Sequence, residues 1–132
     1  MTPSPSHESC CMQGMILFAH GARDARWAEP FERTATRLRD LVPAAHVALA
    51  YLEFMSPNLA DCANKLIAQG CTRMTVLPVF LSAGGHVRKD LPAQVDALRQ
   101  AHPSVTFELH TAAGESELLV EAIAQWAAGA AA

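Results

Sequence analysis

Residues 74–92 read MTVLPVFLSAGGHVRKDLP: an apolar run, a glycine-rich loop with a histidine, and a basic stretch ending in Asp-Leu-Pro. The run Met74–Leu81 contains no charged residue. A short apolar run that ends at glycines is typical of a strand buried on both faces of a parallel sheet. We therefore expect this run to form a central strand, with Gly84, Gly85 and His86 at its carboxyl end. Asp90 is predicted to cap the helix that follows, with Leu91, Val95 and Leu98 facing inward.

The same strand-then-helix pattern occurs four times along the chain. The expected strands are Met15–Ala19, Val47–Leu52, Met74–Leu81 and Val105–Leu109. Helices are expected over 27–42, from a Ser56-Pro57 cap to Gly70, from Asp90 onward, and over a last segment lined by Leu118, Leu119, Ala122, Ile123 and Trp126. Four such units predict an α/β fold: a four-stranded parallel, doubly wound sheet with helices on both faces. We expect the flavodoxin-like strand order 2-1-3-4.

Length and composition predict a single domain. The chain has 132 residues, of which 51% are hydrophobic and 17% charged. We expect a flexible tail at 1–13 and one globular domain at 14–132. The net charge of −3, without a basic stripe, argues against nucleic acid as a partner. No apolar run is long enough to cross a membrane or to act as a signal peptide, so we expect a cytoplasmic protein.

The cysteine pattern does not predict a disulfide framework. Cys10 and Cys11 are adjacent in the expected tail, Cys62 and Cys71 lie in or beside a helix, and there is no CxxC pair. His7 together with Cys10 and Cys11 is a candidate site for a soft metal. We favour the simpler interpretation, in which these are incidental thiols in a tail.

Three potential metal ligands follow the first three expected strands. His20 and His86 come after the first and third strands, and Glu53 ends the second. In the order 2-1-3-4 these strands are neighbours, so the three side chains should meet at the carboxyl edge of the sheet. Two neutral imidazoles and one carboxylate suit Fe²⁺ or Co²⁺ with open coordination positions, and Zn²⁺ would also be accepted. Because the imidazoles must be neutral to bind, metal affinity should fall in acid.

Basic residues flank these potential ligands. Arg23 and Arg26 follow the first strand, and Arg88 and Lys89 follow the third. Together with the backbone N–H groups of the Gly84-Gly85 pair, they would complement a flat ligand rich in carboxylates. The alternative is a solvated loop in which the arginines form local ion pairs, for example with Asp24 or Asp90.

Three stretches of the sequence resemble a known family. LFAHGARDARW (17–27), AYLEFMSPNL (50–59) and VLPVFLSAGGHVRKDLP (76–92) closely resemble the short form of the CbiX/SirB sirohydrochlorin chelatases, over residues 15–128. The resemblance implies a chelatase-like fold and the insertion of Co²⁺ or Fe²⁺ into sirohydrochlorin, in cobalamin or sirohaem biosynthesis. The divalent metal is then a substrate, and no organic cofactor is expected. A nickel-inserting relative leaves Ni²⁺ open as well.

The resemblance also assigns roles by position. His20 and His86 match the metal-binding, catalytic histidines of the family, and Glu53 matches its acidic partner. We expect the tetrapyrrole substrate to meet Arg23, Arg88 and the loop residues Ser82, Gly84 and Gly85. Longer relatives hold a tetrapyrrole between two such domains, which implies a homodimer here. Many relatives have a His-Pro pair before the last helix, whereas this chain has Ala113-Gly114-Glu115-Ser116.

Two other functions are compatible with parts of the pattern. A metal or tetrapyrrole carrier would use the same three residues, but would bind without releasing a metallated product. A histidine phosphatase would use His20 as nucleophile and Arg23 as phosphate clamp. Such enzymes place arginine before the histidine, where this chain has Ala19. His110, which ends the fourth strand, is a further candidate for the same edge.

Overall fold

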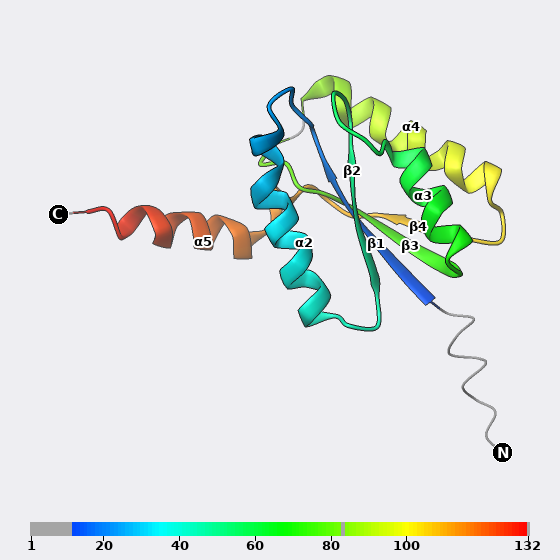
Figure 1. Ribbon diagram of the computed structural model, residues 1–132. Helices are drawn as coiled ribbons and strands as arrows, with labels where there is room; N and C mark the ends of the chain where they lie inside the picture. The colour runs from blue at the N-terminus through cyan, green and yellow to red at the C-terminus, as the bar shows by residue number, and fades with distance from the viewer. Residues whose placement is uncertain (1–11, 83, 132) are drawn as a thin grey trace, which may run out of the picture.

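The computed structural model describes residues 12–82 and 84–131, and its centre is a four-stranded parallel sheet (Figure 1). The strands lie in the order β2-β1-β3-β4, which confirms the predicted order. Their bounds are β1 Met12–Ala19, β2 His46–Tyr51, β3 Cys71–Pro78 and β4 Thr106–Leu109. Met12 and Gln13, expected in the tail, are the first residues of β1. The candidate soft-metal site of His7, Cys10 and Cys11 lies outside the described residues.

Helices connect the strands as the pattern predicted, with differences at their starts. The helical elements are η1 Ala25–Ala28, α2 Glu29–Leu41, α3 Leu59–Ala68, α4 Gly85–Ala101, η2 Ala113–Glu115 and α5 Glu117–Ala128. The Ser56-Pro57 cap is wrong, because Asn58 caps α3 by accepting a 2.8 Å hydrogen bond from the backbone N–H of Asp61. Both residue types make good caps, and the Ser56–Pro57 peptide bond, which is cis, lies before the helix.

The predicted cap at Asp90 is also wrong, since α4 begins five positions earlier at Gly85. The backbone N–H of Arg88 donates to the carbonyl of Gly84 at 3.0 Å, so the glycine-rich loop already leads into the first helical turn. Glycine has a low helix propensity, which is why the sequence pattern suggested a loop there. His86 is therefore the second residue of a long helix.

Alternation along the strands divides the core between the two faces of the sheet. One face, with Ile16, Phe18 and Val76, packs against α3 and α4. The opposite face places Leu17 and Val47 against Ala35 of α2. Both clusters follow from the period of two in an extended chain.

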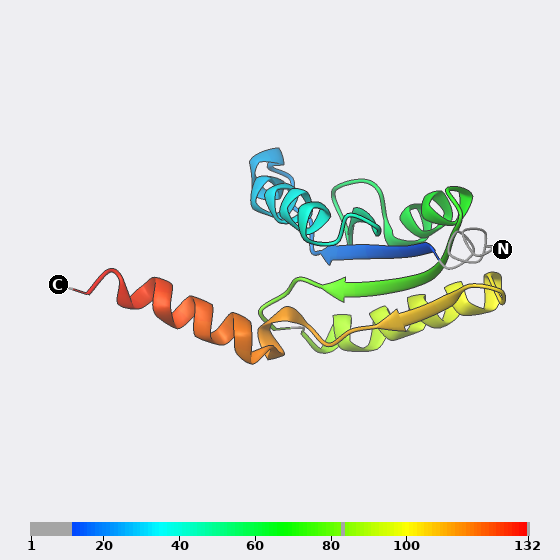
Figure 2. The ribbon, with the colours of Figure 1, turned by 90° about the horizontal axis from the view of Figure 1, so that it is seen from below.

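The last helix does not join this core, contrary to expectation. The side chains of Leu118 and Trp126 are 83% and 80% exposed, and α5 contains no buried residue. Figures 1 and 2 show α5 as an arm that leaves the body of the molecule. Within residues 12–82 and 84–131, no helix is long and apolar enough to span a bilayer.

The buried core predicts the effect of a large-to-small substitution. Ile16 is fully buried, so Ile16→Ala should lower the free energy of unfolding by about 2–5 kcal/mol, through lost burial and the cavity left behind. Leu81→Ala is the control, because Leu81 is 68% exposed and should change stability by less than about 0.5 kcal/mol. Urea unfolding at one protein concentration measures both. Equal effects would contradict this assignment of the core.

Candidate active site

His20 and Glu53 lie side by side because the pairing of β1 and β2 continues beyond both strands. The backbone N–H of Leu52 donates to Ala19 at 2.9 Å, and that of Glu53 donates to His20 at 3.0 Å. Gly21 makes this approach possible. Its φ is +95°, and a Cβ atom at this position would lie 1.9 Å from the carbonyl oxygen of Glu53. Only glycine fits the position.

The side chains of these two residues form a direct hydrogen bond. Nε2 of His20 lies 2.8 Å from Oε2 of Glu53, and the side chains are 50% and 48% exposed. In the neutral tautomer whose Nε2 donates to the carboxylate, Nδ1 of His20 presents a lone pair. A carboxylate that orients a histidine in this way is a common arrangement around protein-bound metals.

The pair borders a cavity of about 510 Å³. Its apolar walls are Leu52, Phe80 and Val87, and its polar lining includes Ser82 and Gly84. Phe80 is held by edge-to-face contact with the buried Phe18, their ring centroids 6.0 Å apart. The sequence reasoning missed these apolar walls. Their positions in the sequence could have indicated them, since each lies within a few residues of a polar residue predicted for the site. The volume falls in the usual range for small-molecule sites.

The structure brings together two of the three predicted ligands. The backbone of His86 is in the first turn of α4, beside Gly84 of the cavity lining, and its side chain lies outside the described part of the structure. Among the described side chains there is no group of three His, Cys, Asp or Glu residues placed to hold a metal. Metal binding by His20, Glu53 and His86 therefore stays a prediction.

The predicted basic contacts occupy different places around the cavity. Arg26 forms a 3.0 Å ion pair with Asp24, the local pairing considered as the alternative, and its hydrogen bonds hold the pKa of that carboxyl below its usual value. The guanidinium of Arg23 lies over the ring of Phe54, 4.7 Å from the centroid. The carboxyl edge thus carries an exposed cation stacked on an exposed aromatic ring.

Arg88 lines a neighbouring hollow of about 150 Å³ together with His110. Phe80 and Val87 line both spaces and form the wall between them. Arg88 and His110 are therefore close to the main cavity without lining it. Gly85 begins α4 with open space around its Cα, as a close approach by a ligand requires.

The segment Ala113-Gly114-Glu115-Ser116 supports the cavity from behind. The backbone N–H of Gly114 donates to the carbonyl of Phe80 at 2.8 Å, and a Cβ atom at Gly114 would lie 1.5 Å from the carbonyl oxygen of Leu81. This segment holds the chain that leads from β3 to Ser82. Its positioning role was not predicted from the sequence.

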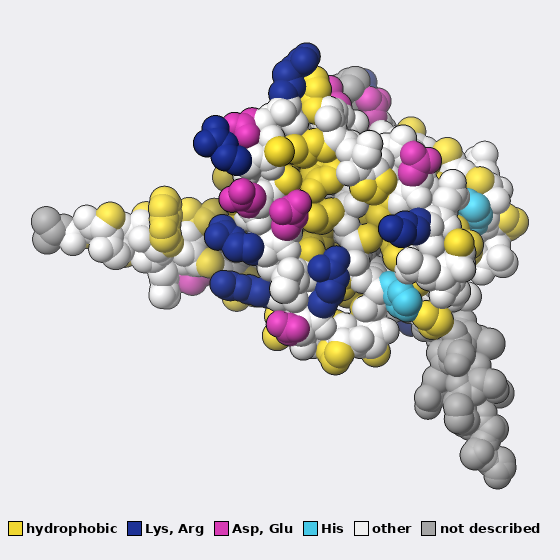
Figure 3. Space-filling view, viewed as in Figure 1, with side chains coloured by type: hydrophobic (Ala, Val, Ile, Leu, Met, Phe, Trp, Pro, Cys, Tyr) yellow, Lys and Arg dark blue, Asp and Glu magenta, His cyan; other side chains and the backbone are white. Residues whose placement is uncertain are grey.

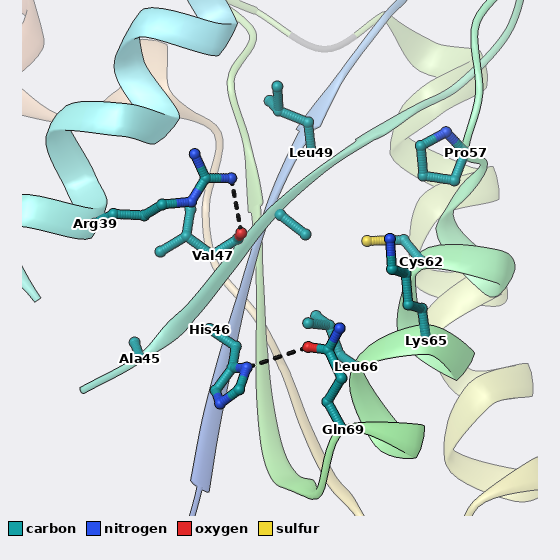
Figure 4. A pocket seen from close by; sticks show the side chains of 11 residues that line it. Arg39, Ala45, His46, Val47, Leu49, Pro57, Cys62, Lys65, Leu66 and Gln69 are labelled. Atoms are coloured by element: carbon teal, nitrogen blue, oxygen red, sulfur yellow. Dashed lines mark hydrogen bonds between the residues drawn. The ribbon is translucent and has the colours of Figure 1, made fainter. Parts of the chain in front are cut away.

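A second cavity, of about 480 Å³, lies along the edge strand β2 (Figure 4). Arg39 of α2 lines one side, and Lys65 of α3 and Gln69, which follows that helix, line the other. Its polar groups already pair with one another: His46 Nδ1 lies 3.1 Å from Gln69 Oε1, and Arg39 donates to the Val47 carbonyl at 3.1 Å. Ligands of open parallel sheets bind at the carboxyl edge, which favours the cavity beside His20.

Comparison with known proteins identifies the family of this chain. The sequence profile of the CbiX family matches residues 14–130. The chain belongs to the CbiX family. A crystal structure of a CbiX protein from Marinobacter aquaeolei VT8 superposes with a TM-score of 0.78 at 38% identity, covering 89% of this chain and 95% of that one.

Other relatives are more distant. A sirohydrochlorin cobaltochelatase from Methanococcus aeolicus is 30% identical over 81 residues, which are 61% of this chain and 57% of that protein. One from Sulfurisphaera tokodaii is 28% identical, over 67% of this chain and 72% of its own length. The sirohydrochlorin chelatase SirB from Bacillus subtilis subspecies spizizenii, crystallised with cobalt, shares the fold with a TM-score of 0.78 at 21% identity. The structural match spans 91% of this chain and 51% of the SirB chain.

The contact between Gly21 and Glu53 yields a testable consequence. Gly21→Ala should lower the free energy of unfolding by more than about 1 kcal/mol, because the new methyl group meets a carbonyl and the positive φ is strained. Gly85→Ala is the matched control, since a Cβ atom there meets nothing within 4 Å. Thermal unfolding of both variants decides the matter. A Gly21→Ala protein as stable as Gly85→Ala would contradict the described contact.

Proposed function

We propose that this protein is a metal chelatase that inserts a divalent ion, Co²⁺ first and Fe²⁺ next, into sirohydrochlorin or a closely related carboxylate-rich tetrapyrrole. The observation that carries the proposal is the His20–Glu53 pair in the lining of an apolar-walled cavity, in a chain of the CbiX family. The order of metals follows the cobaltochelatase names of the relatives and the cobalt in the SirB structure. Cobalt insertion would place the protein in cobalamin biosynthesis, and iron insertion in sirohaem biosynthesis.

The metal substrate would be held by His20, Glu53 and His86. Imidazole nitrogen and carboxylate oxygen suit Co²⁺ and Fe²⁺, and three protein ligands leave positions open for the incoming ring. Both described ligands are half exposed, so water retains access to the ion. An ion held this weakly can exchange its protein and water ligands for four ring nitrogens.

The same pair would handle the protons. Insertion of M²⁺ into the ring releases two N–H protons, and each needs an acceptor. When the ion leaves His20 and Glu53, a lone pair on each becomes available to accept a proton. Solvent beside these half-exposed side chains then carries the protons away.

The surroundings of the cavity fit a flat acidic macrocycle. Leu52, Phe80 and Val87 offer an apolar wall to the ring. The amino-terminal end of α4 begins at the Gly84 cap and favours anionic groups through its free N–H donors. Arg23, Arg88, Ser82 and Gly85 would meet the ring's carboxylates around the rim.

The cavity is open on one side of a single domain, so we propose that the protein acts as a homodimer. A second copy would cover the exposed side of the ring. A non-catalytic carrier built on the same ligands is the competing function, and turnover separates the two. A carrier would bind one metal or one ring per site and release no metallated product.

Substitutions of the three ligands test the proposal. His20→Ala and His86→Ala should each lower the rate of Co²⁺ insertion into sirohydrochlorin by about 10²–10⁴-fold, followed by the absorption spectrum of the ring. Glu53→Gln keeps an oxygen acceptor for His20 but loses the charge, and should lower the rate by about 10–100-fold. His46→Ala is the control, because His46 pairs with Gln69 near the opposite end of β2. Undiminished insertion by His86→Ala would overturn its assignment.

The choice of metal is measured with the unmodified protein. Purified protein is mixed with sirohydrochlorin and with Co²⁺, Fe²⁺ or Ni²⁺, and each rate is divided by that of the uncatalysed reaction. We expect the largest ratio for Co²⁺. Binding of ring and metal without repeated turnover would support the carrier instead.

A further inference from the structure

Helix α5 is apolar yet has no partner in its own chain. It spans the 12 residues Glu117–Ala128. Leu119 is partly buried, and every other residue of the helix is exposed. Its exposed large side chains are Leu118, Val120, Ile123 and Trp126. Figure 3 shows hydrophobic side chains standing on this arm. An isolated helix of this length is marginal in water, so α5 needs a surface to pack against.

One face of the sheet lacks a matching cover. The α3–α4 face of β3 is closed, with Met74, Val76 and Pro78 all buried. The other face of β3 presents Thr75, Leu77 and Val79, which are only partly buried. In Figure 2, α2 lies next to β1, on which it packs through Ala35 and Leu17, whereas β3 has no helix over it. Strands of a parallel sheet are normally covered on both faces, so this surface also needs a partner.

The chain cannot bring its own α5 onto this face without rearranging η2. Figure 2 shows that α4 runs back along the sheet from the edge where the strands end, whereas α5 continues away from that edge. The turn before α5 is fixed by the hydrogen bond from Gly114 to Phe80 and by the close packing of Gly114 on Leu81. The direction of α5 is therefore set by well-packed backbone.

We propose that α5 of a second copy lies on this face, beside α2, and that two copies exchange these helices reciprocally. A helix of 12 residues is about 18 Å long, and a strand of 8 residues such as β3 about 26 Å, so the helix fits along the strand. An α5 arriving across the carboxyl edge would run antiparallel to the strands, as α2, α3 and α4 do. The inference specifies how the proposed homodimer forms and does not depend on chelatase chemistry.

The flank of α2 that borders the open face is complementary to α5. Arg39 reaches Val47 of the edge strand β2, so the opposite flank of α2, with Pro30, Thr34 and Leu41, lies on the side of β3. Leu41 is the last residue of α2 and is 79% exposed. An arriving α5 would bring Trp126, near its end, to the same end of the sheet as Leu41.

Charges on the two helices also match. α5 contains Glu117 and Glu121 and no Lys or Arg. Arg33 and Arg37 line a shallow groove on α2 with Pro30 and Thr34. Figure 3 shows both basic and acidic side chains over this helix, which also carries Glu29, Glu32 and Asp40. Acidic groups of the arriving helix would meet these arginines at the rim of an apolar contact.

This exchange would place the carboxyl edges of two sheets opposite each other, because each α5 leaves its sheet from that edge. The cavity beside His20 and Glu53 opens at the same edge. Each copy would then cover the open side of the other's cavity.

The test uses Trp126 as a probe in full-length protein. In a Trp27→Phe background, Trp126 is the remaining tryptophan, and its emission should shift to the blue as the dimer forms on concentration. Sedimentation measures the dissociation constant in the same samples. Trp126→Glu and Leu118→Glu should raise that constant by about 30-fold or more, as for central contact residues. Ala124→Gln, on the side of α5 opposite Trp126, is the control and should leave it within about threefold.

A second set of variants identifies the surface that receives α5. Leu77→Lys and Thr75→Arg change the open face of β3, leave α5 intact, and should also yield monomers, with circular dichroism showing that they remain folded. A stable dimer of both variants would mean that α5 pairs with α5, and would overturn the exchange. A monomer at all concentrations with buried Trp126 would mean that α5 folds onto its own chain, which overturns it equally. No metal or tetrapyrrole is present, so failure here is distinct from failure of the proposed activity.

Discussion

The parallel pairing of β1 with β2 beyond their last residues is the constraint on which the site depends. Hydrogen bonds from the N–H groups of Leu52 and Glu53 to the carbonyls of Ala19 and His20 keep the two segments in register for two more residues. That register needs a residue without a side chain at position 21, because the carbonyl of Glu53 occupies the place of a Cβ atom. The 2.8 Å contact between the His20 and Glu53 side chains follows from this backbone arrangement. A site positioned by main-chain bonds needs no buried side-chain network to hold it, and both side chains are free to remain half exposed.

Much of this arrangement could be predicted from the sequence, for physical reasons. Apolar runs of four to eight residues, alternating with helical patterns, determine a parallel sheet, and the strand order then brings His20 and Glu53 to one edge. Boundaries that depend on competition between similar signals were less predictable. Asn58 and Ser56 are both suitable cap residues for α3. The start of α4 lies at a pair of glycines, which the sequence pattern assigns to a loop. The support that Gly114 gives to Phe80 joins segments far apart in sequence, so no local pattern could reveal it.

The error at α5 has a different origin. Its apolar residues correctly indicate a helix that must be covered, but a sequence pattern does not specify which molecule supplies the cover. The side chains of α5 are as apolar as those of a buried helix, yet most of them are exposed to solvent. β3 shows the opposite shortfall. Its side chains are buried on the face covered by α3 and α4 but only partly buried on the other face. Two incomplete surfaces in one chain, separated by a turn that is hydrogen-bonded to Phe80, favour association between copies over refolding within one.

Reciprocal exchange would connect the stability of the fold to the geometry of the site. A single domain offers His20 and Glu53 at an open edge, where a bound ion keeps access to water and exchanges readily. A flat ring on that edge would leave one face exposed, and water would compete for the metal during transfer. If the same helices that complete the sheets also hold two such edges together, folding and closure of the site share one contact. A small domain can then enclose a large ligand without a second domain in the same chain.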